Sequence, residues 1–244
     1  MAIATQLTRG PSGAHAIRSG EWQAPAVSAL DRLLCAVPIG IAMSMLAPEA
    51  LADTVWAACG CATRNQFQAA ALLATAVSLS IESRDIHLVE AVQIVSDMTQ
   101  RGEPEQGPDV LTSTRQALNF QANSVWVGSY SPISPLTRKL SGHTPSSLLI
   151  PLAFLVSGDR YDSTSTSTLG EMCGEPRLLR IISELLSNFS PPGRYFSHRL
   201  MERVERDSHL DLLGVTGQLL ELRPPAPESW LRRAVGHSDS HYSS

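Results

Sequence analysis

The stretch QFQAAALLATAVSLSI, from Gln66 to Ile81, decides the fold class of this chain. It is rich in alanine, carries no charged side chain, and contains neither glycine nor proline. Alanine has the highest helix propensity, so the stretch predicts a helix. Because its side chains are small, we expect neighbouring helices to approach it closely.

Helical patterns also occupy most of the chain on both sides of this stretch, and no alternation typical of a strand is long enough to predict one. We therefore expect an all-α fold, a multi-helix orthogonal bundle. Further helices are predicted over residues 39–46, 48–58, 85–99, 110–121, 144–156, 176–188, 196–206 and 208–222.

Composition divides the chain into three parts. Residues 1–26 are rich in Gly, Ser, Thr and Ala and predict a loose arm, residues 27–223 predict a single helical domain, and residues 224–244 predict a flexible tail. Within the domain, RGEPEQGP (residues 101–108) predicts a turn or linker and SYSPISPL (129–136) a loop, while SGDRYDSTSTST (157–168) is expected to be a polar stretch.

The overall composition excludes some classes of partner. The chain of 244 residues is 43% hydrophobic but only 5% aromatic, which predicts an aliphatic core. Its net charge is −4 and it has no basic block, so neither nucleic acid nor an anionic membrane is expected as a partner. Lys139 is its only lysine, and arginine in place of lysine is typical of a GC-rich bacterial genome.

Cysteines and an early apolar run both bear on localisation. Cys35, Cys59, Cys61 and Cys173 are interpreted as small buried side chains in a reducing compartment, rather than as a metal site or a disulfide framework. The run from Leu33 to Thr54 imitates a secretory signal, but no short basic leader precedes it, and prolines interrupt it. It is also too short to span a bilayer. We expect a buried helix pair in a cytoplasmic protein.

The order of the predicted helices resembles the ADP-ribosylglycohydrolase family. The segments that carry the resemblance are LLCAVPIGIA, PEALADTVWAACGCATRNQFQAAALLATAVSLSI, GHTPSSLLIPLAFLVSGD and YFSHRLMERVERDSHLDLLGVTGQLLEL. Together they cover roughly residues 28 to 222, and the evidence is their collinear order rather than any single motif. The resemblance implies an all-helical fold that hydrolyses a glycosidic bond to ADP-ribose with the help of Mg²⁺.

The chain departs from the family where the metal ligands belong. The early acidic motif has no counterpart, and the family's first helices do not fit into so short an arm. The late acidic motif falls on residues 174–178, GEPRL, where Glu175 keeps a carboxylate but Arg177 replaces the second acid. A guanidinium cannot ligate a cation, so we expect no metal and no other cofactor. An alternative places a displaced metal motif at residues 158–164, GDRYDST, which also fits an Asp-rich turn that caps a helix.

Glu175 and Arg177 open a predicted helix, where free N–H groups favour an anion. In the functional interpretation Arg177 holds a phosphate or carboxylate of a small-molecule ligand and Glu175 acts as an acid or base. In the structural interpretation Glu175 caps the helix and Arg177 makes a surface ion pair.

Five more residues are candidates because they fall in loops that match the family. Thr63 and Arg64 are candidate ligand-binding residues, with an N-cap and a solvated cation as the alternative. Arg64 stands where the family has a histidine. Asp31 is a candidate general base, or a helix cap, and Arg32 beside it a candidate ligand-binding residue. His143 is a candidate acid or base, or a turn histidine without a role.

Two classes of function follow from the resemblance. In the first, the protein is a metal-independent enzyme that acts on an ADP-ribosyl, nucleoside-like or other polar metabolite, in a repurposed biosynthetic role. In the second, it is a non-catalytic homologue that binds a ligand or a partner chain. Loss of the family's first helices removes part of one wall, so a homodimer or a partner chain is expected to cover the exposed surface.

Overall fold

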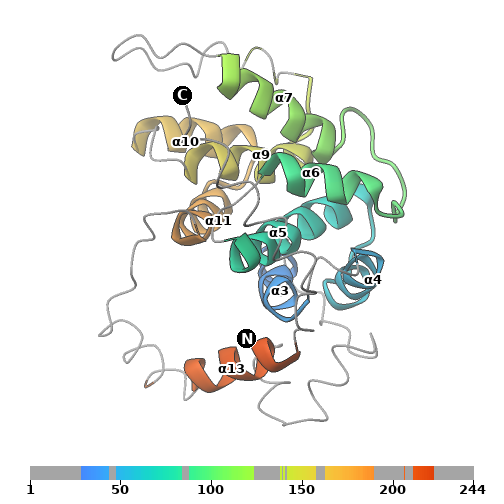
Figure 1. Cartoon of the computed structure of the whole chain (residues 1–244). Helices are drawn as coiled ribbons and strands as arrows, with labels where there is room; N and C mark the ends of the chain where they lie inside the picture. Colours follow the sequence, from blue (N-terminus) through green and yellow to red (C-terminus); the bar gives the residue numbers. More distant parts are fainter. Residues whose placement is uncertain are drawn as a thin grey trace, which may run out of the picture.

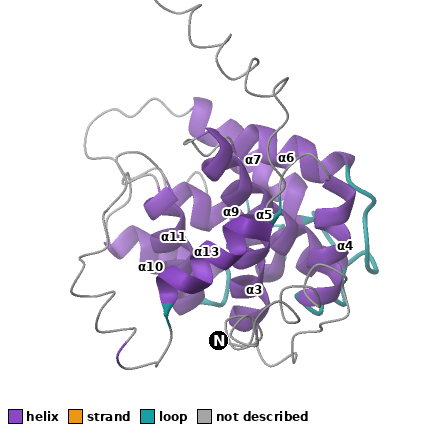
Figure 2. Cartoon of the chain, turned by 60° about the horizontal axis from the view of Figure 1, so that its bottom comes forward, coloured by secondary structure: helices purple, strands orange, loops and turns teal. Residues whose placement is uncertain are grey.

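The computed structural model describes residues 29–43, 48–83, 88–123, 138, 140, 142–157, 163–189, 206 and 211–222. These residues are mostly helical and contain no strand, which confirms an all-α class for this part of the chain (Figures 1 and 2). The helices are α3 (Ala29–Ala42), α4 (Pro48–Ala58), α5 (Arg64–Ser83), α6 (Leu88–Asp97), α7 (Val110–Asn123), α9 (Pro145–Ser157), α10 (Ser163–Met172), α11 (Pro176–Phe189) and α13 (Leu212–Leu222).

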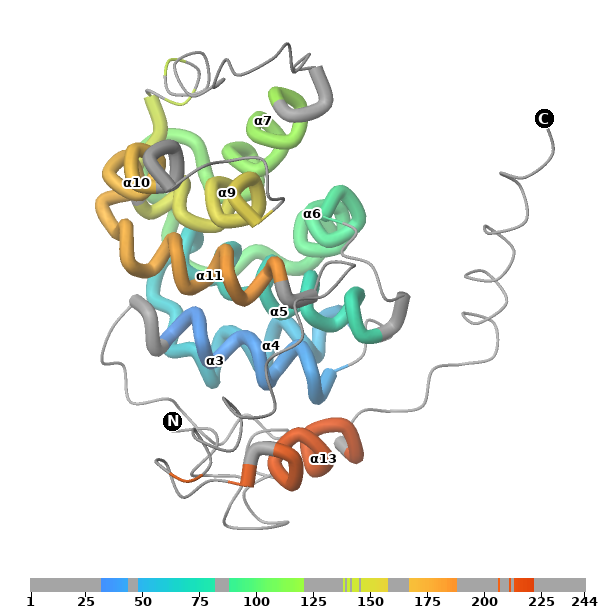
Figure 3. The backbone as a smooth tube through the Cα atoms, turned by 90° about the vertical axis from the view of Figure 1, so that its left-hand side faces the viewer, coloured from blue at the N-terminus to red at the C-terminus, as the bar shows by residue number. Residues whose placement is uncertain are grey.

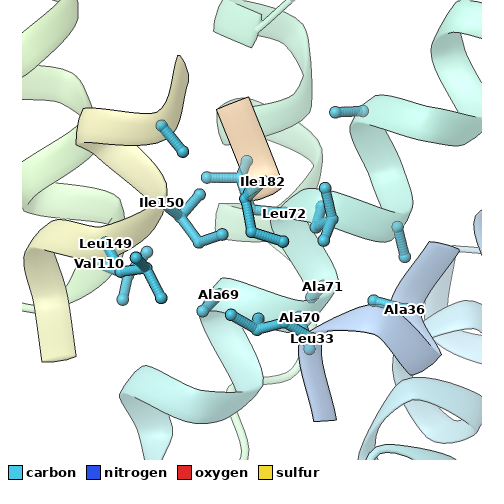
Figure 4. Close-up of a cluster of buried hydrophobic side chains, with 14 of the residues drawn as sticks. Leu33, Ala36, Ala69, Ala70, Ala71, Leu72, Val110, Leu149, Ile150 and Ile182 are labelled. Carbon is cyan, nitrogen blue, oxygen red and sulfur yellow. The ribbon is translucent and has the colours of Figure 1, made fainter. Parts of the chain in front are cut away.

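Helix α5 is the centre of the fold. Residues 67–80 of this helix are all buried, and α3, α4, α6, α7 and α9 pack against it. Figure 4 shows how its first turns are enclosed, with Leu33 of α3 close to Ala69 and Ala70 on one side, and Ile150 of α9 on the other. A helix surrounded in this way has no solvated face, which explains why charged residues are missing from its middle.

The predicted close approach to the alanine-rich helix is confirmed at Gly40 of α3. A Cβ atom on this residue would lie 2.4 Å from the carbonyl oxygen of Ala74 and 2.9 Å from Cβ of Val77, both on α5. The two backbones therefore approach so closely that no side chain fits between them. Helices α3 and α4 also pack together, in agreement with the predicted helix pair in the early apolar segment.

The second half of the described chain adds α9, α10 and α11. Helix α11 packs on α9 and α10 (Figure 3). Gly170 allows the contact with α10, because a Cβ atom there would lie 2.8 Å from Cα of Pro176. Helix α13 packs against α3, and Leu219 is its only buried hydrophobic residue among those described.

Most predicted helices in the described residues are found with ends shifted by a few residues, but α3 begins at Ala29, well before the start predicted at residue 39. The polar stretch at 157–168, for which no helix bounds were predicted, is helical from Ser163 onward, where α10 begins with the sequence STSTST. Serine and threonine are mediocre helix formers. Packing of the helix, with Leu169 fully buried and Gly170 against α11, outweighs that preference.

Several other predictions fall on residues outside the described part. These are the arm at 1–26, the loop at 129–136, almost all of the predicted helix at 196–206, and the tail from 224. The domain boundaries therefore stay predictions. None of the described helices combines the length and the apolar character that a bilayer-crossing helix needs.

The contact at Gly40 leads to a stability prediction. In Gly40→Ala the new methyl group overlaps the backbone of α5, so we expect a loss of about 1–3 kcal/mol of unfolding free energy. The matched control is Gly217→Ala in α13, where a Cβ atom would have no neighbour within 4 Å, and where alanine is expected to stabilise the helix by about 0.5–1 kcal/mol. Urea denaturation measures both, and equal effects of the two variants would contradict the close contact.

Candidate functional site

A cavity of about 390 Å³ lies where several helix ends meet. Four helices contribute residues from at or near their N-termini, and the turn between α10 and α11 closes the site. The lining residues are Arg32 and Leu33 of α3; Asn65, Gln66 and Ala69 of α5; Ser146 and Leu149 of α9; Cys173 and Gly174 of the turn; and Glu175 and Leu178 at the start of α11. We call this cavity the central pocket.

The convergence of helix N-termini gives the central pocket a positive character. Each N-terminus presents N–H groups without intrahelical partners and the positive end of a helix dipole. Helices α3, α5, α9 and α11 all begin beside the pocket, whereas only α10 ends there. The backbone alone therefore favours an anionic group in this cavity.

Arg32 adds a full positive charge to the pocket wall. Its side chain is partly buried, and its Nε atom is buried without a hydrogen-bond partner. Among the described residues, no hydrogen bond or ion pair joins its guanidinium to another side chain or to the backbone. A buried N–H without a partner is costly, whereas an arginine can satisfy several oxygens of a phosphate or carboxylate at once. Arg32 was among the candidates from sequence, and the structure places it in the pocket.

The N-terminus of α5 is held by a reciprocal cap. The hydroxyl of Thr63 accepts a hydrogen bond from the backbone N–H of Gln66 at 3.3 Å. In return, Oε1 of Gln66 accepts from the backbone N–H groups of Ala62 at 2.9 Å and Thr63 at 3.4 Å. This is a capping box, so the predicted N-cap at Thr63 is confirmed. Thr63 does not line the pocket; its partner Gln66 does.

Glu105 was not among the candidates from sequence; it lies outside the pocket lining and bonds to the lining residues Asn65 and Ser146. Its Oε2 atom accepts hydrogen bonds from Asn65 Nδ2 at 2.8 Å and from the Ser146 hydroxyl at 2.9 Å. Partial burial tends to raise the pKa of Glu105, but hydrogen bonds from Thr63, Ser146 and Asn65 lower it below its usual value. Glu105 thus links α5 to α9 as an ionised acceptor.

The segment at 99–109 that carries Glu105 is fastened to α5. The backbone N–H of Arg64 donates to the carbonyl of Glu103 at 3.0 Å. Gly102 has a φ of +83°, and a Cβ atom there would lie 2.6 Å from the backbone of Thr63, so this position requires glycine. Arg64, a candidate from sequence, does not line the pocket, and its Nε atom is buried without a partner.

The far end of this segment is fixed by Asp109. Its carboxylate caps α7 by accepting from the backbone N–H of Thr112 at 2.8 Å, and it accepts from Gln68 Nε2 of α5 at 3.0 Å. Burial tends to raise the pKa of Asp109, but the hydrogen bonds from Gln68 and Thr112, and the charge of Arg115, lower it. The carboxylate form is therefore the one that the fold stabilises.

The two candidates at the start of α11, Glu175 and Arg177, have different surroundings. Glu175 lines the pocket, and its carbonyl accepts the first helical hydrogen bond, from Leu179 at 2.9 Å. Its carboxylate is exposed and has no hydrogen-bond partner among the described residues. Arg177 is exposed, makes no ion pair there, and does not line the pocket.

His143 lies outside the pocket lining and has structural partners. Its Nδ1 atom is 2.7 Å from the hydroxyl of Ser113, and its Nε2 atom is 2.9 Å from Oε1 of Gln116. Both partners belong to α7, so the ring ties the start of α9 to that helix. Burial lowers the pKa of His143, which favours the neutral ring at neutral pH.

The structure does not describe the acidic side chains of two further candidates, Asp31 and the alternative motif at 158–164. Asp31 lies in the first turn of α3, next to Arg32, but its side chain is outside the described part. Residues 158–162, which hold both acids of the alternative acidic motif, are outside it as well.

The lining residues do not fit the magnesium site that the family resemblance implies. Mg²⁺ prefers several oxygen ligands in octahedral array. Among the described lining residues Glu175 offers the only carboxylate, and the cation Arg32 shares the pocket with it. The described residues include no group of three His, Cys, Asp or Glu side chains placed to hold a metal ion.

The four cysteines are free thiols, and three of them are buried. Burial raises the pKa of Cys61 to about 12 and that of Cys59 well above its usual value. Burial also raises the pKa of Cys173, the cysteine that lines the pocket. These groups are protonated at neutral pH and are poor nucleophiles.

Comparison with protein-family models, curated proteins and solved structures finds no match to this chain. The family resemblance therefore rests on the order and composition of the segments in the sequence.

Asp109 gives a prediction about pH. A lowered pKa in the folded state means that the carboxylate contributes stability above its unfolded pKa and loses it as the pH falls through the folded pKa. In Asp109→Asn an amide N–H₂ faces the Gln68 amide, so we expect a loss of about 1 kcal/mol at pH 7. The deficit should shrink in acid, where the wild-type carboxyl is protonated.

Urea titrations at a series of pH values measure this difference. The exposed Glu90→Gln in α6 is the control and should match the wild type throughout. If the loss of unfolding free energy in Asp109→Asn does not change with pH, the conclusion that Asp109 caps α7 as a carboxylate is contradicted.

Proposed function

We propose that this chain is a divergent, metal-independent relative of the ADP-ribosylglycohydrolases, and that its central pocket binds a small polar molecule with a phosphate or carboxylate group. The observation that carries the proposal is Arg32, a cation that has no ion-pair partner among the described residues and lies in a pocket built from four helix N-termini. Both features favour an oxyanion.

The location of the pocket supports the family part of the proposal. The resemblance selected residues in four separate places: 31–32, 63–64, His143 and 174–178. Arg32, Gly174, Glu175 and Leu178 line the pocket, and Thr63 and Arg64 directly precede the lining residue Asn65, whereas His143 lies outside the lining. That three of these places, distant in sequence, gather around one cavity supports the proposal.

Two versions of the function remain, and one observation favours the non-catalytic one. Glycosidases usually employ a pair of carboxyl groups, whereas Glu175 is the only one among the described lining residues. In the catalytic version Glu175 is one acid–base group and Asp31, adjacent to Arg32, supplies the other. In the non-catalytic version Glu175 only binds.

Binding of an oxyanion is tested with Arg32→Met. We expect inorganic phosphate and ADP-ribose to raise the melting temperature of the wild type in the absence of Mg²⁺. In Arg32→Met the phosphate affinity should fall by a factor of about ten or more, because a charge-assisted contact of roughly 1.5–3 kcal/mol is removed.

Arg177→Met is the matched control, since Arg177 also lies at a helix start beside this pocket but is exposed and does not line it. It should bind phosphate like the wild type. A loss of phosphate affinity in Arg177→Met, without such a loss in Arg32→Met, would place the anion outside the pocket and contradict the proposal.

Glu175→Gln distinguishes the two versions. If the wild type hydrolyses ADP-ribosyl or nucleoside substrates, the variant should lose turnover by about 10²-fold or more while still showing the thermal shift with ADP-ribose. If the wild type binds but shows no turnover over such a substrate panel, the non-catalytic version holds.

A homodimer or covering partner chain stays a prediction. The exposed large hydrophobic residues among those described are Val89 of α6, Ile181 of α11, and Leu213 and Leu220 of α13.

A further inference from the structure

Asn65 is a buried amide whose orientation can be deduced from its neighbours. Its side chain is only 2% exposed and lines the central pocket. One terminal atom lies 2.8 Å from Oε2 of Glu105. A carboxylate only accepts hydrogen bonds, so this terminal atom must be Nδ2, the donor. The oxygen Oδ1 therefore points away from Glu105.

The oxygen of Asn65 has no hydrogen-bond partner among the described residues. Nδ2 uses the contact with Glu105 and a longer one, at 3.5 Å, with the Ser146 hydroxyl. No N–H or O–H in the part of the chain that the structure describes donates to Oδ1. Because Asn65 lines the pocket, Oδ1 is open to a hydrogen bond from a donor on a group inside the pocket.

The orientation of the Gln66 amide follows from the same kind of argument, but here the protein engages the oxygen and not the nitrogen. Its Oε1 atom faces two backbone N–H groups, those of Ala62 and Thr63, and must be the acceptor. Its Nε2 atom is therefore the other end of the amide, and it donates to no residue in the part of the chain that the structure describes. Gln66 thus offers the pocket a donor, as Arg32 does, whereas Asn65 and Glu175 offer acceptors.

The pocket wall thus offers both donors and acceptors that are not used by other described residues. A ligand with only an anionic group would satisfy Arg32 and Gln66, but it would leave Asn65 Oδ1 unpaired and would be repelled by the Glu175 carboxylate. A ligand with only hydroxyl or amino groups would leave Arg32 unpaired. Both sets are satisfied by one molecule that contains both functions.

We propose that the central pocket selects a small molecule that combines an anionic group with a hydroxyl or amino donor, and that Asn65 is the residue that reads the donor. This inference rests on the proposed function, since it specifies the ligand of the same pocket. The anionic group, a phosphate or a carboxylate, binds Arg32 and Gln66 Nε2, and the hydroxyl or amino group donates to Asn65 Oδ1.

Glu105 is a positioning residue in this arrangement. It does not line the pocket, and it acts by holding Nδ2 of Asn65 so that Oδ1 stays available. A glutamine at this position can present an N–H instead of an oxygen, so it permits Asn65 to turn its own N–H₂ into the pocket. The preference for a donor on the ligand would then weaken.

Two pairs of matched probes test the inference on the wild-type chain. The phosphate pair is glycerol 3-phosphate with propyl phosphate, and the carboxylate pair is glycerate with propanoate. The members of each pair share the anion and differ in the hydroxyl groups. In the pair whose anion fits, we expect the hydroxylated probe to bind about tenfold more tightly, because one or two hydrogen bonds are lost with its partner. Titration followed by NMR measures the dissociation constants.

Two variants assign the preference to residues. In Asn65→Leu the ratio of the two dissociation constants should fall to about one, while the affinity for the non-hydroxylated probe stays near that of the wild type. Glu105→Gln should lower the same ratio. A purely structural role of Glu105 would reduce the affinity for both probes alike and leave their ratio unchanged.

The outcomes separate this inference from the proposed function. If both members of a pair bind the wild type equally, the donor-reading role of Asn65 is wrong, while an anion site at Arg32 stands. If a preference is found and survives in Asn65→Leu, Asn65 is not the residue that reads the donor, and the inference is overturned. If no probe and no inorganic phosphate binds, the proposed function fails together with the inference.

Discussion

The burial of residues 67–80 of α5 is the constraint on which the rest of this structure depends. Polar side chains on a helix without a solvated face need protein partners, although the buried Thr75 hydroxyl has none among the described residues. Gln68, only 1% exposed, bonds to Gln100, Asp109 and the backbone of Leu111, and Ser78 donates to the carbonyl of Met43 in the segment after α3. These bonds locate the segment at 99–109 and the end of α3 relative to α5. At the N-terminus of the same helix, Asn65 and Gln66 line the central pocket.

Much of the helical framework was predictable because it depends on local chemistry. Pro48, Pro145 and Pro176 each begin a helix as expected, since proline suits the first turn and lacks the N–H that would go unpaired there. The alanines of α5 predicted close packing, which Gly40 confirms. The beginning of α10 was not predictable in this way, because STSTST has a weak preference of its own and depends on its neighbours.

The site was predictable only in part, because its decisive contacts join distant residues. Glu105 stands in a Gly- and Pro-rich segment that predicts a linker, and nothing local shows that it meets Asn65, 40 residues earlier. Arg177 stood in the matching motif, but position in a first turn does not determine the direction of a side chain. With about 3.6 residues per turn, Leu178 faces the pocket while its neighbour Arg177 faces solvent. Arg32, on another helix, supplies the positive charge.

The pocket is lined by residues between positions 32 and 178, and none of its four helices directly follows another along the chain, since α4 separates α3 from α5 and α10 separates α9 from α11. The residues that line the cavity are far apart in the sequence, so the cavity exists only after the long-range packing is complete. Detachment of a single helix removes one wall and the binding competence with it. By mass action, an occupant then stabilises the whole assembly of helices rather than one of them. Binding of the proposed ligand would therefore shift the folding equilibrium of all these helices together.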